Sequence, residues 1–371
     1  MCWILVCNNY AQTIQEDSPK TPSIQVALLL DTSNSMDGLI IQTTQRIWDV
    51  VNVLAKVRYD SIIPHLEFSL YEYGNDNLPA REGYIRQVLP FTNDLDKFSD
   101  EIFSLKTKGG FEYAGRAIHQ AVHNLAWSQD SLSIRMIYIA GNERFNQGNY
   151  PFEKAIQEAI EKDIQIHTIY CGDPERGKRE LWELAADLGT GRYVAINHNL
   201  PVSYVMSPYD QELLALNDSL NATYLPYGQH AFERKEKQLL QDYYALDISE
   251  QNLVNRVVTK VSPLYKNADW DAVDAYKSGI KLIEIQEELL DTYCLPKDCT
   301  EQIKHLHDER KSIKKRISEL IDKRYEFLEQ HESNLVATDD NIGKAIIESV
   351  LKAATEKGYQ LLSGSPVENE L

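Results

Sequence analysis

Three oxygen-bearing side chains stand on alternate residues where an apolar segment ends. Asp31, Ser33 and Ser35 follow the mostly apolar run 24–30, whose composition is typical of a strand buried on both faces. One carboxylate and two hydroxyls at this spacing place three hard oxygens on one side of a tight loop. Such a set suits a small hard cation such as Mg²⁺, which takes oxygen ligands and keeps several of its waters. The loop also follows the carboxyl end of a strand, where open α/β sheets bind ligands.

The same residues have a purely structural interpretation. Asp and Ser are common in turns and just before helices, where the side-chain oxygen accepts a backbone N–H hydrogen bond. A helix is predicted directly afterwards, because apolar side chains recur at helical spacing between residues 39 and 57. Taken alone, residues 31–38 therefore leave a cation loop and a helix-capping turn open as alternatives.

A buried strand followed by D-x-S-x-S, here Val26 to Gly38, resembles the metal-ion-dependent adhesion site of the von Willebrand factor A (VWA) family. The chain is similar to bacterial secreted or periplasmic VWA proteins with a helical C-terminal extension. The resemblance implies a divalent cation, Mg²⁺ or else Mn²⁺ or Ca²⁺, held by Asp31, Ser33 and Ser35. In that family the ion's open coordination position accepts an acidic side chain of a protein partner. The resemblance thus implies an interaction module rather than an enzyme.

The family pattern has two further loops, and both are altered in this chain. After Gly109-Gly110 the family usually has Thr; Phe111 stands there, and the resemblance implies that Glu112 replaces the Thr as a ligand or nearby acceptor. The alternative is that Glu112 is merely an acid favoured by the dipole of the following helix. After the next apolar run, Asn142 stands where the family has Asp, with Glu143 as the fallback. An amide oxygen can still bind a hard cation.

A pair of histidines offers a second kind of metal chemistry. His119 and His123 are four residues apart in a predicted helix, so both rings lie on one face, as in a zinc pair. Gln120 stands where a zinc protease would have its catalytic Glu, and the neighbouring sequence supplies no third ligand. The pattern therefore favours ordinary helix-surface histidines. The sequence has no phosphate-binding loop, nucleophile elbow or H-E-x-x-H motif.

Strand and helix patterns alternate over residues 23–198 and must position these loops. They predict strands at 24–30, 65–73, 84–90, 135–140, 164–171 and 192–196, and helices at 39–57, 91–105, 116–126, 151–161 and 178–188. The second and third strands are expected to form a hairpin that makes one edge strand antiparallel. The fold class predicted is α/β, a doubly wound, mostly parallel sheet with one antiparallel edge strand.

From residue 207 the pattern becomes helical. It predicts helices at 210–222, 232–245, 251–261, 269–293, 303–327 and 339–362. We expect residues 269–331 to form a long antiparallel helical hairpin, its tip closed by a disulfide between Cys294 and Cys299. An intermolecular coiled coil is the alternative, because the second arm keeps an apolar heptad that only Arg310 and Arg324 interrupt.

Length and charge limit the classes of function. The 371 residues can hold one domain of about 200 residues and a smaller region. We expect a signal-like segment and linker at 1–23, a VWA-like domain at 24–200 and a helical region at 201–371. The formal net charge of −18 argues against binding to nucleic acid or an anionic membrane. No internal apolar run is long enough to span a bilayer.

The first twelve residues look like the end of a secretory signal, with an apolar core and then Ala11 as a small residue for cleavage. This predicts a periplasmic or secreted protein. A lipoprotein attached through Cys7 and a short first strand are alternatives. A cytosolic module that serves an ATPase partner would require that the segment is not a signal.

Three functions remain open from the sequence. The first is a cation-dependent module that binds an acidic group of a protein partner. The second is a metal-independent interaction scaffold, which the altered residues Phe111 and Asn142 motivate. The third is a hydrolase that activates water with the metal, for which Glu112 or Glu143 would have to be the general base. Nothing in the sequence specifies the oligomeric state.

Overall fold

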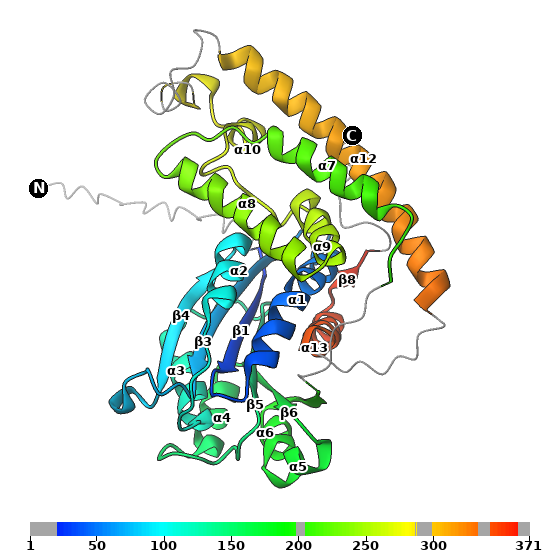
Figure 1. Cartoon of the computed structure of the whole chain (residues 1–371). Helices are drawn as coiled ribbons and strands as arrows, with labels where there is room; N and C mark the ends of the chain where they lie inside the picture. Colours follow the sequence, from blue (N-terminus) through cyan, green and yellow to red (C-terminus); the bar gives the residue numbers. More distant parts are fainter. Residues whose placement is uncertain (1–20, 198–204, 286, 288–298, 333–341, 363–371) are drawn as a thin grey trace, which may run out of the picture.

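Six strands form the sheet that carries the predicted loops (Figure 1). The computed structural model describes residues 21–197, 205–285, 287, 299–332 and 342–362. The strand order is β4-β3-β1-β5-β6-β7, and only β4 runs antiparallel to its neighbour. The predicted α/β fold class is thereby confirmed. The strands are β1 (Ser23–Asp31), β3 (His65–Tyr73), β4 (Ile85–Thr92), β5 (Ile134–Gly141), β6 (Gln165–Cys171) and β7 (Thr190–Ile196).

β1 is the central strand, and its apolar sequence follows from that position. It pairs in parallel with β3 on one side and with β5 on the other. Its side chains alternate between two cores, with Val26 and Leu28 in one and Ala27 and Leu29 in the other. A strand buried on both faces needs apolar residues at consecutive positions. Asp31, the last residue of this strand, is the first polar side chain after that run.

Helices cover both faces of the sheet. The first face packs against α1 (Asp37–Leu54), α2 (Leu95–Ser104) and α13 (Ile342–Glu356). The second packs against α3 (Ala114–Asn124), α4 (Phe152–Ile160), α5 (Pro174–Arg179) and α6 (Trp182–Leu188). The single helix predicted at 178–188 is wrong, because Leu181 has a left-handed backbone with φ 73° that separates α5 from α6.

The helical C-terminal region shares its core with the sheet domain. α9 packs on α1, and α13 packs on α1, β5 and β7, so the apolar core continues across residue 200. A short antiparallel pair, β2 (Val57–Arg58) with β8 (Gln360–Leu361), joins the two regions a second time. None of the described helices is long and apolar enough to span a membrane. The remaining helices are α7 (Asp210–Ala222), α8 (Ala231–Ile248), α9 (Glu250–Val261), α10 (Ala272–Lys277) and α12 (Cys299–Glu332).

The predicted hairpin at 269–331 is wrong in its first arm. That arm is not one helix, since α10 ends at Lys277 and Gly279 has a φ of +91°, a turn conformation. The second arm is a single helix, α12, which packs against the shorter helices α7, α9 and α10. The disulfide between Cys294 and Cys299 stays a prediction, because Cys294 lies outside the described residues.

The two arginines that interrupt the heptad of α12 are buried and paired with acids of the same chain. Arg310 donates to Asp274 at 2.7 Å and also contacts Asp271, the residue that caps α10. Arg324 donates to Asp210 at 3.0 Å. The apolar positions between them are buried in the chain's own core, which explains the heptad without an intermolecular coiled coil.

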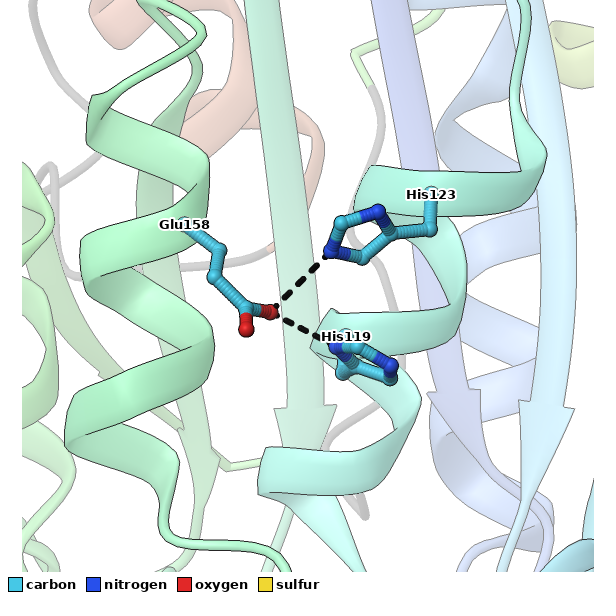
Figure 2. Close-up of side chains that lie close together, drawn as sticks. All are labelled: His119, His123 and Glu158. Carbon is cyan, nitrogen blue, oxygen red and sulfur yellow. Dashed lines mark hydrogen bonds and ion pairs between the residues drawn. The ribbon is translucent and has the colours of Figure 1, made fainter.

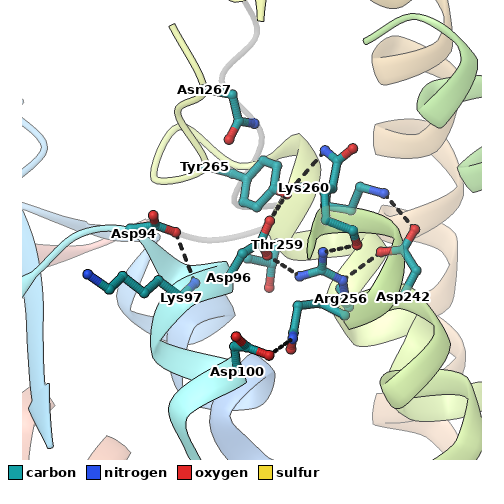
Figure 3. A network of polar contacts seen from close by, with 12 residues as sticks. Asp94, Asp96, Lys97, Asp100, Asp242, Arg256, Thr259, Lys260, Tyr265 and Asn267 are labelled. Atoms are coloured by element: carbon teal, nitrogen blue, oxygen red, sulfur yellow. Dashed lines mark hydrogen bonds and ion pairs between the residues drawn. The ribbon is translucent and has the colours of Figure 1, made fainter. Parts of the chain in front are cut away.

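A buried polar network joins α2, α8 and α9 (Figure 3). Arg256 is fully buried and donates to Asp242 and to Asp96, each at 2.6 Å. Lys260 donates to Asp242 at 2.9 Å, and the Tyr265 hydroxyl donates to Asp96 at 2.5 Å. α9 is buried from Gln251 to Val261, and its charged side chains Arg256 and Lys260 each have a partner of opposite sign.

Candidate metal site

The predicted ligands come from loops that meet at one edge of the sheet. Asp31 ends β1, Asn142 directly follows the neighbouring strand β5, and Glu112 lies just before α3. Two hydrogen bonds join the loop after Asp31 to the loop that carries Glu112. Lys108 N–H donates to the Thr32 carbonyl oxygen at 2.9 Å, and Gly109 N–H donates to Asn34 Oδ1 at 2.6 Å. The edge is the carboxyl end of the parallel strands, as expected for an α/β sheet.

Two acids lie side by side in this edge. Asp31 is fully buried and Glu112 is 7% exposed. Burial, together with the nearby charge of Glu143, raises the pKa of Asp31 to about 6. Burial and the adjacent Asp31 carboxylate raise the pKa of Glu112 to about 9. Because two carboxylates in a dry site disfavour each other's charge, the pair keeps a proton at neutral pH when no cation is bound.

Apart from the proton that Asp31 and Glu112 retain between them, several oxygens at this edge have no hydrogen-bond donor among the described residues. They are Asp31 Oδ2, Ser33 Oγ and Asn142 Oδ1, all shielded from solvent. The other oxygen of Asp31 accepts a hydrogen bond from Ser33 N–H at 2.7 Å, and Asn142 Nδ2 donates to Ser35 Oγ at 2.8 Å. Buried polar atoms usually have partners. A carboxylate, a hydroxyl and an amide oxygen are the donor set that a hard divalent cation takes, so these residues fit such an ion.

Glycines let two loops approach the carboxylates closely. A Cβ on Gly74 would lie 2.8 Å from Asp31 Oδ1 and 2.9 Å from Glu112 Cγ, and its φ of +81° also favours glycine. A Cβ on Gly141 would lie 2.5 Å from the Tyr73 hydroxyl and 3.2 Å from Asp31 Oδ2. The backbone of Gly141 thus lies close to Asp31, and Asn142 is the residue that follows it. The sequence analysis missed the roles of Gly74, Gly141 and Tyr73.

The outer side of the edge is open to solvent. Ser35 and Glu143 are exposed, and Phe111 is 57% exposed. The Phe111 ring packs against Tyr84 and Tyr113, with centroid distances of 5.7 and 6.1 Å, so it lies on an aromatic surface beside Glu112. The edge thus has buried acids on its inner side and accessible side chains on its outer side.

The structure brings the sequence-predicted residues together, though not in equal positions. Asp31, Ser33 and Glu112 form the buried part, whereas Ser35 and Asn142 bond to each other at the rim. Glu143, the fallback, is exposed and acts on the two acids only through its charge.

No protein-family model matches the sequence, and no curated protein matches it. The chain is similar to solved structures that include an aerotolerance-related membrane protein from Bacteroides fragilis, with 17% identity and a TM-score of 0.33, covering 48% of this chain and 94% of that one. Another is a von Willebrand factor type A protein from Catenulispora acidiphila, with 14% identity and a TM-score of 0.35, covering 47% and 39%. A third is proximal thread matrix protein 1 from the mussel byssus, with a zinc-occupied MIDAS motif, 12% identity and a TM-score of 0.34, covering 47% and 42%.

These likenesses cover about half of this chain and only about two fifths of the Catenulispora and mussel proteins. With TM-scores below 0.5 these likenesses carry no argument, and the fold class rests on the chain's own strand order. The sheet is mostly parallel, has one antiparallel edge strand and is covered by helices on both faces, as the sequence resemblance implies. The N-terminal half of this chain therefore has the doubly wound, mostly parallel α/β fold that the sequence resemblance to the von Willebrand factor A family implies.

Proposed function

We propose that the chain is a protein-interaction module whose VWA-like domain binds a divalent cation. The ligands are Asp31, Ser33, Ser35, Glu112 and Asn142, directly or through water. The observation that supports this most strongly is that Asp31 Oδ2, Ser33 Oγ and Asn142 Oδ1, on loops at one edge of the sheet, are buried and have no donor among the described residues. Oxygen ligands alone favour Mg²⁺, with Mn²⁺ or Ca²⁺ as substitutes.

The cation would supply the attraction for a partner. The site contains at most two acidic ligands, and their negative charge no more than cancels the charge of a divalent ion. Little negative charge therefore remains to repel an incoming carboxylate. We propose that an acidic side chain of a protein partner takes the open coordination position. The exposed Ser35 and Phe111 would border that contact. The proposal includes a periplasmic or secreted location, which rests on the signal-like start of the sequence.

We propose binding rather than catalysis. A metal-dependent hydrolase would need a free general base near the ion, but Glu112 faces Asp31 and Glu143 projects from an exposed loop. A panel of phosphatase and esterase substrates with Mg²⁺ and Mn²⁺ tests this directly. Turnover that Asp31→Ala abolishes would overturn the binding-only proposal.

The thermal unfolding midpoint tests the cation. It is measured in EDTA and then in millimolar Mg²⁺, Mn²⁺ and Ca²⁺ for wild type and Asp31→Ala, with Asp187→Ala as a control at an exposed acid of α6. A ligand that binds only the folded state adds about 2.7 kcal/mol at 100 times its dissociation constant. We expect a rise in wild type and in Asp187→Ala and none in Asp31→Ala. No rise with any ion would favour a metal-independent scaffold.

A further inference from the structure

A second cluster of metal-binding side chains lies between α3 and α4 (Figure 2). His119 Nδ1 is 2.6 Å from Glu158 Oε2, and His123 Nε2 is 3.2 Å from the same oxygen. The two nitrogens and the oxygen all lie within 4.8 Å of one another. The sequence offered the histidine pair without a third ligand. The fold supplies that ligand from the neighbouring helix.

Helix geometry and close packing fix the positions of the three side chains. The histidines are one turn apart on α3, whose opposite side is buried against the sheet through Ala117 and Ala121. Gly115 allows α3 to meet the start of α4, since a Cβ there would lie 2.6 Å from the Tyr150 carbonyl oxygen. Near the other end of the cluster, Lys162 Nζ donates to the Val122 carbonyl oxygen at 2.8 Å. The facing sides of α3 and α4 are therefore held in place on both sides of the cluster.

Tyr150 orients the carboxylate. Its hydroxyl donates to Glu158 Oε1 at 2.7 Å, so the other oxygen, Oε2, faces the two imidazoles. The Tyr150 ring also stacks on His119, with centroids 4.3 Å apart. Metal ligands in proteins are commonly fixed by such hydrogen bonds from neighbouring groups, which also tune the affinity.

We propose that His119, His123 and Glu158 form a zinc site. Two imidazoles and one carboxylate are a ligand set that zinc accepts, and three protein ligands leave a fourth position for water. Imidazole nitrogens favour zinc and similar transition metals over Mg²⁺ and Ca²⁺. The separations of 2.6 to 4.8 Å bracket the roughly 3.4 Å between ligands that each lie about 2.1 Å from a tetrahedral ion.

The site is accessible from solvent, and the described residues provide only these three ligands. The side chains of His119, His123 and Glu158 are 32%, 44% and 20% exposed. Water or a donor atom from another molecule can complete the coordination. Zinc here would crosslink α3 to α4 and would be separate from the loop cation, since α3 rises about 7.5 Å from Ala114 to His119 and Glu112 lies two residues before the helix begins.

The competing explanation is a surface ion pair between a carboxylate and two histidines, an interaction worth little in water. Zinc titration calorimetry on the full chain separates the two. The variants are His119→Gln, His123→Gln and Tyr150→Phe, with His305→Gln as a control at an exposed histidine of α12. Asp31→Ala removes the loop site, so zinc that still binds to this variant is bound at the histidine cluster. Far-UV circular dichroism verifies the fold of each variant.

We expect one zinc ion to bind to wild type, Asp31→Ala and His305→Gln with the same affinity. Either ligand substitution should weaken it by more than about 100-fold, and Tyr150→Phe should weaken it by roughly 10-fold, because only the orientation of Glu158 is lost. Co²⁺ in place of zinc should give the visible absorption of a tetrahedral nitrogen–oxygen site in Asp31→Ala. Equal zinc binding by wild type, His119→Gln and His123→Gln would overturn the proposal, as would a zinc ion that only Asp31→Ala removes.

Discussion

Two buried acids, Asp242 in the helical half of the molecule and Asp31 in the sheet half, have opposite surroundings. In the helical half, both oxygens of Asp242 accept hydrogen bonds from buried cations, Arg256 at 2.6 Å and Lys260 at 2.9 Å, and these charges hold its pKa well below the usual range. In the sheet half, Asp31 has a raised pKa, a second acid beside it and an oxygen without a donor among the described residues. A paired buried charge supports the fold, whereas an unpaired one indicates a place for a ligand.

Asp242→Asn should have the largest effect on stability. The substitution keeps the shape of the side chain but leaves Arg256 and Lys260 buried with less compensating charge. Removing one member of a buried ion pair costs about 3–5 kcal/mol. Urea unfolding at neutral pH measures this loss, because the depressed pKa of Asp242 makes its contribution complete above the ordinary carboxyl pKa. A loss below about 1 kcal/mol would mean that the network in Figure 3 adds little to folding.

Replacing Asp31 by Asn should change the free energy of unfolding in the opposite direction when no cation is present. The pKa of Asp31 is about 6 in the folded protein, above its ordinary value of 3.8. Ionisation therefore costs stability as the pH rises above 3.8, and the cost is complete above pH 6. Asp31→Asn in EDTA at pH 7.5 should raise the free energy of unfolding by about 1–3 kcal/mol. Urea unfolding in which Asp31→Asn is destabilised like Asp242→Asn would remove the contrast between the two halves.

His167 is an intermediate case, a buried titratable group with one partner. Its Nδ1 accepts a hydrogen bond from Arg192 N–H at 3.1 Å, and burial lowers its pKa to about 3. The unfolded chain takes up a proton near pH 6.5 and the folded chain only near pH 3, so stability falls as the pH falls through that window. We expect wild type to lose about 2 kcal/mol between pH 7 and pH 5 through this group. His167→Gln keeps a hydrogen-bond acceptor but does not titrate in this range. Between pH 7 and pH 5 its free energy of unfolding should therefore fall by about 2 kcal/mol less than that of wild type.

Arg316→Ala should have the smallest effect. Arg316 on α12 donates to Glu212 on α7 at 2.6 Å, but the two side chains are 44% and 48% exposed. Exposed ion pairs contribute between zero and about 1 kcal/mol. Urea unfolding should therefore show a change well below that of Asp242→Asn. A loss comparable to the buried substitution would show that exposure does not separate structural from incidental charges in this chain.

The strands of the sheet could be predicted because a buried strand requires apolar side chains at consecutive positions, and this pattern is visible in the sequence. β1 and β5 are apolar on both faces, and β3 and β4 are separated by a turn signal. The error in the long hairpin could not be foreseen, because helical periodicity over 269–293 does not distinguish one long helix from the short helix α10 followed by a turn. The decisive contact is Arg310 with Asp271 and Asp274, which lie more than thirty positions earlier in the chain. The position of α13 on the sheet was missed for a similar reason, since an apolar helix face does not specify its partner.

The candidate cation site could be predicted where its ligands are local. Asp31, Ser33 and Ser35 are spaced within one loop, while Glu112 and Asn142 followed from the resemblance to a family. The structure places all five at one edge of the sheet. Contacts that depend on close backbone approach, such as Gly74 against Asp31, leave no pattern in the sequence.

The third ligand of the histidine cluster could not have been selected from the sequence. Glu158 lies 35 positions after His123, among 56 acidic residues. Only the packing of α4 on α3 distinguishes it from the others. Helical phase gives only a weak signal, because it places Glu158 at the flank of the buried side chains of α4 and does not say which helix that flank faces.

The most direct test of the account is anomalous X-ray diffraction from crystals grown with Mn²⁺. The account predicts an anomalous peak roughly 2.0–2.3 Å from Asp31 Oδ2, Ser33 Oγ and Ser35 Oγ, and its loss in Asp31→Asn crystals grown in the same way. The absence of a peak at this loop in millimolar Mn²⁺, or a peak only beside His119, His123 and Glu158, would contradict the proposed cation site.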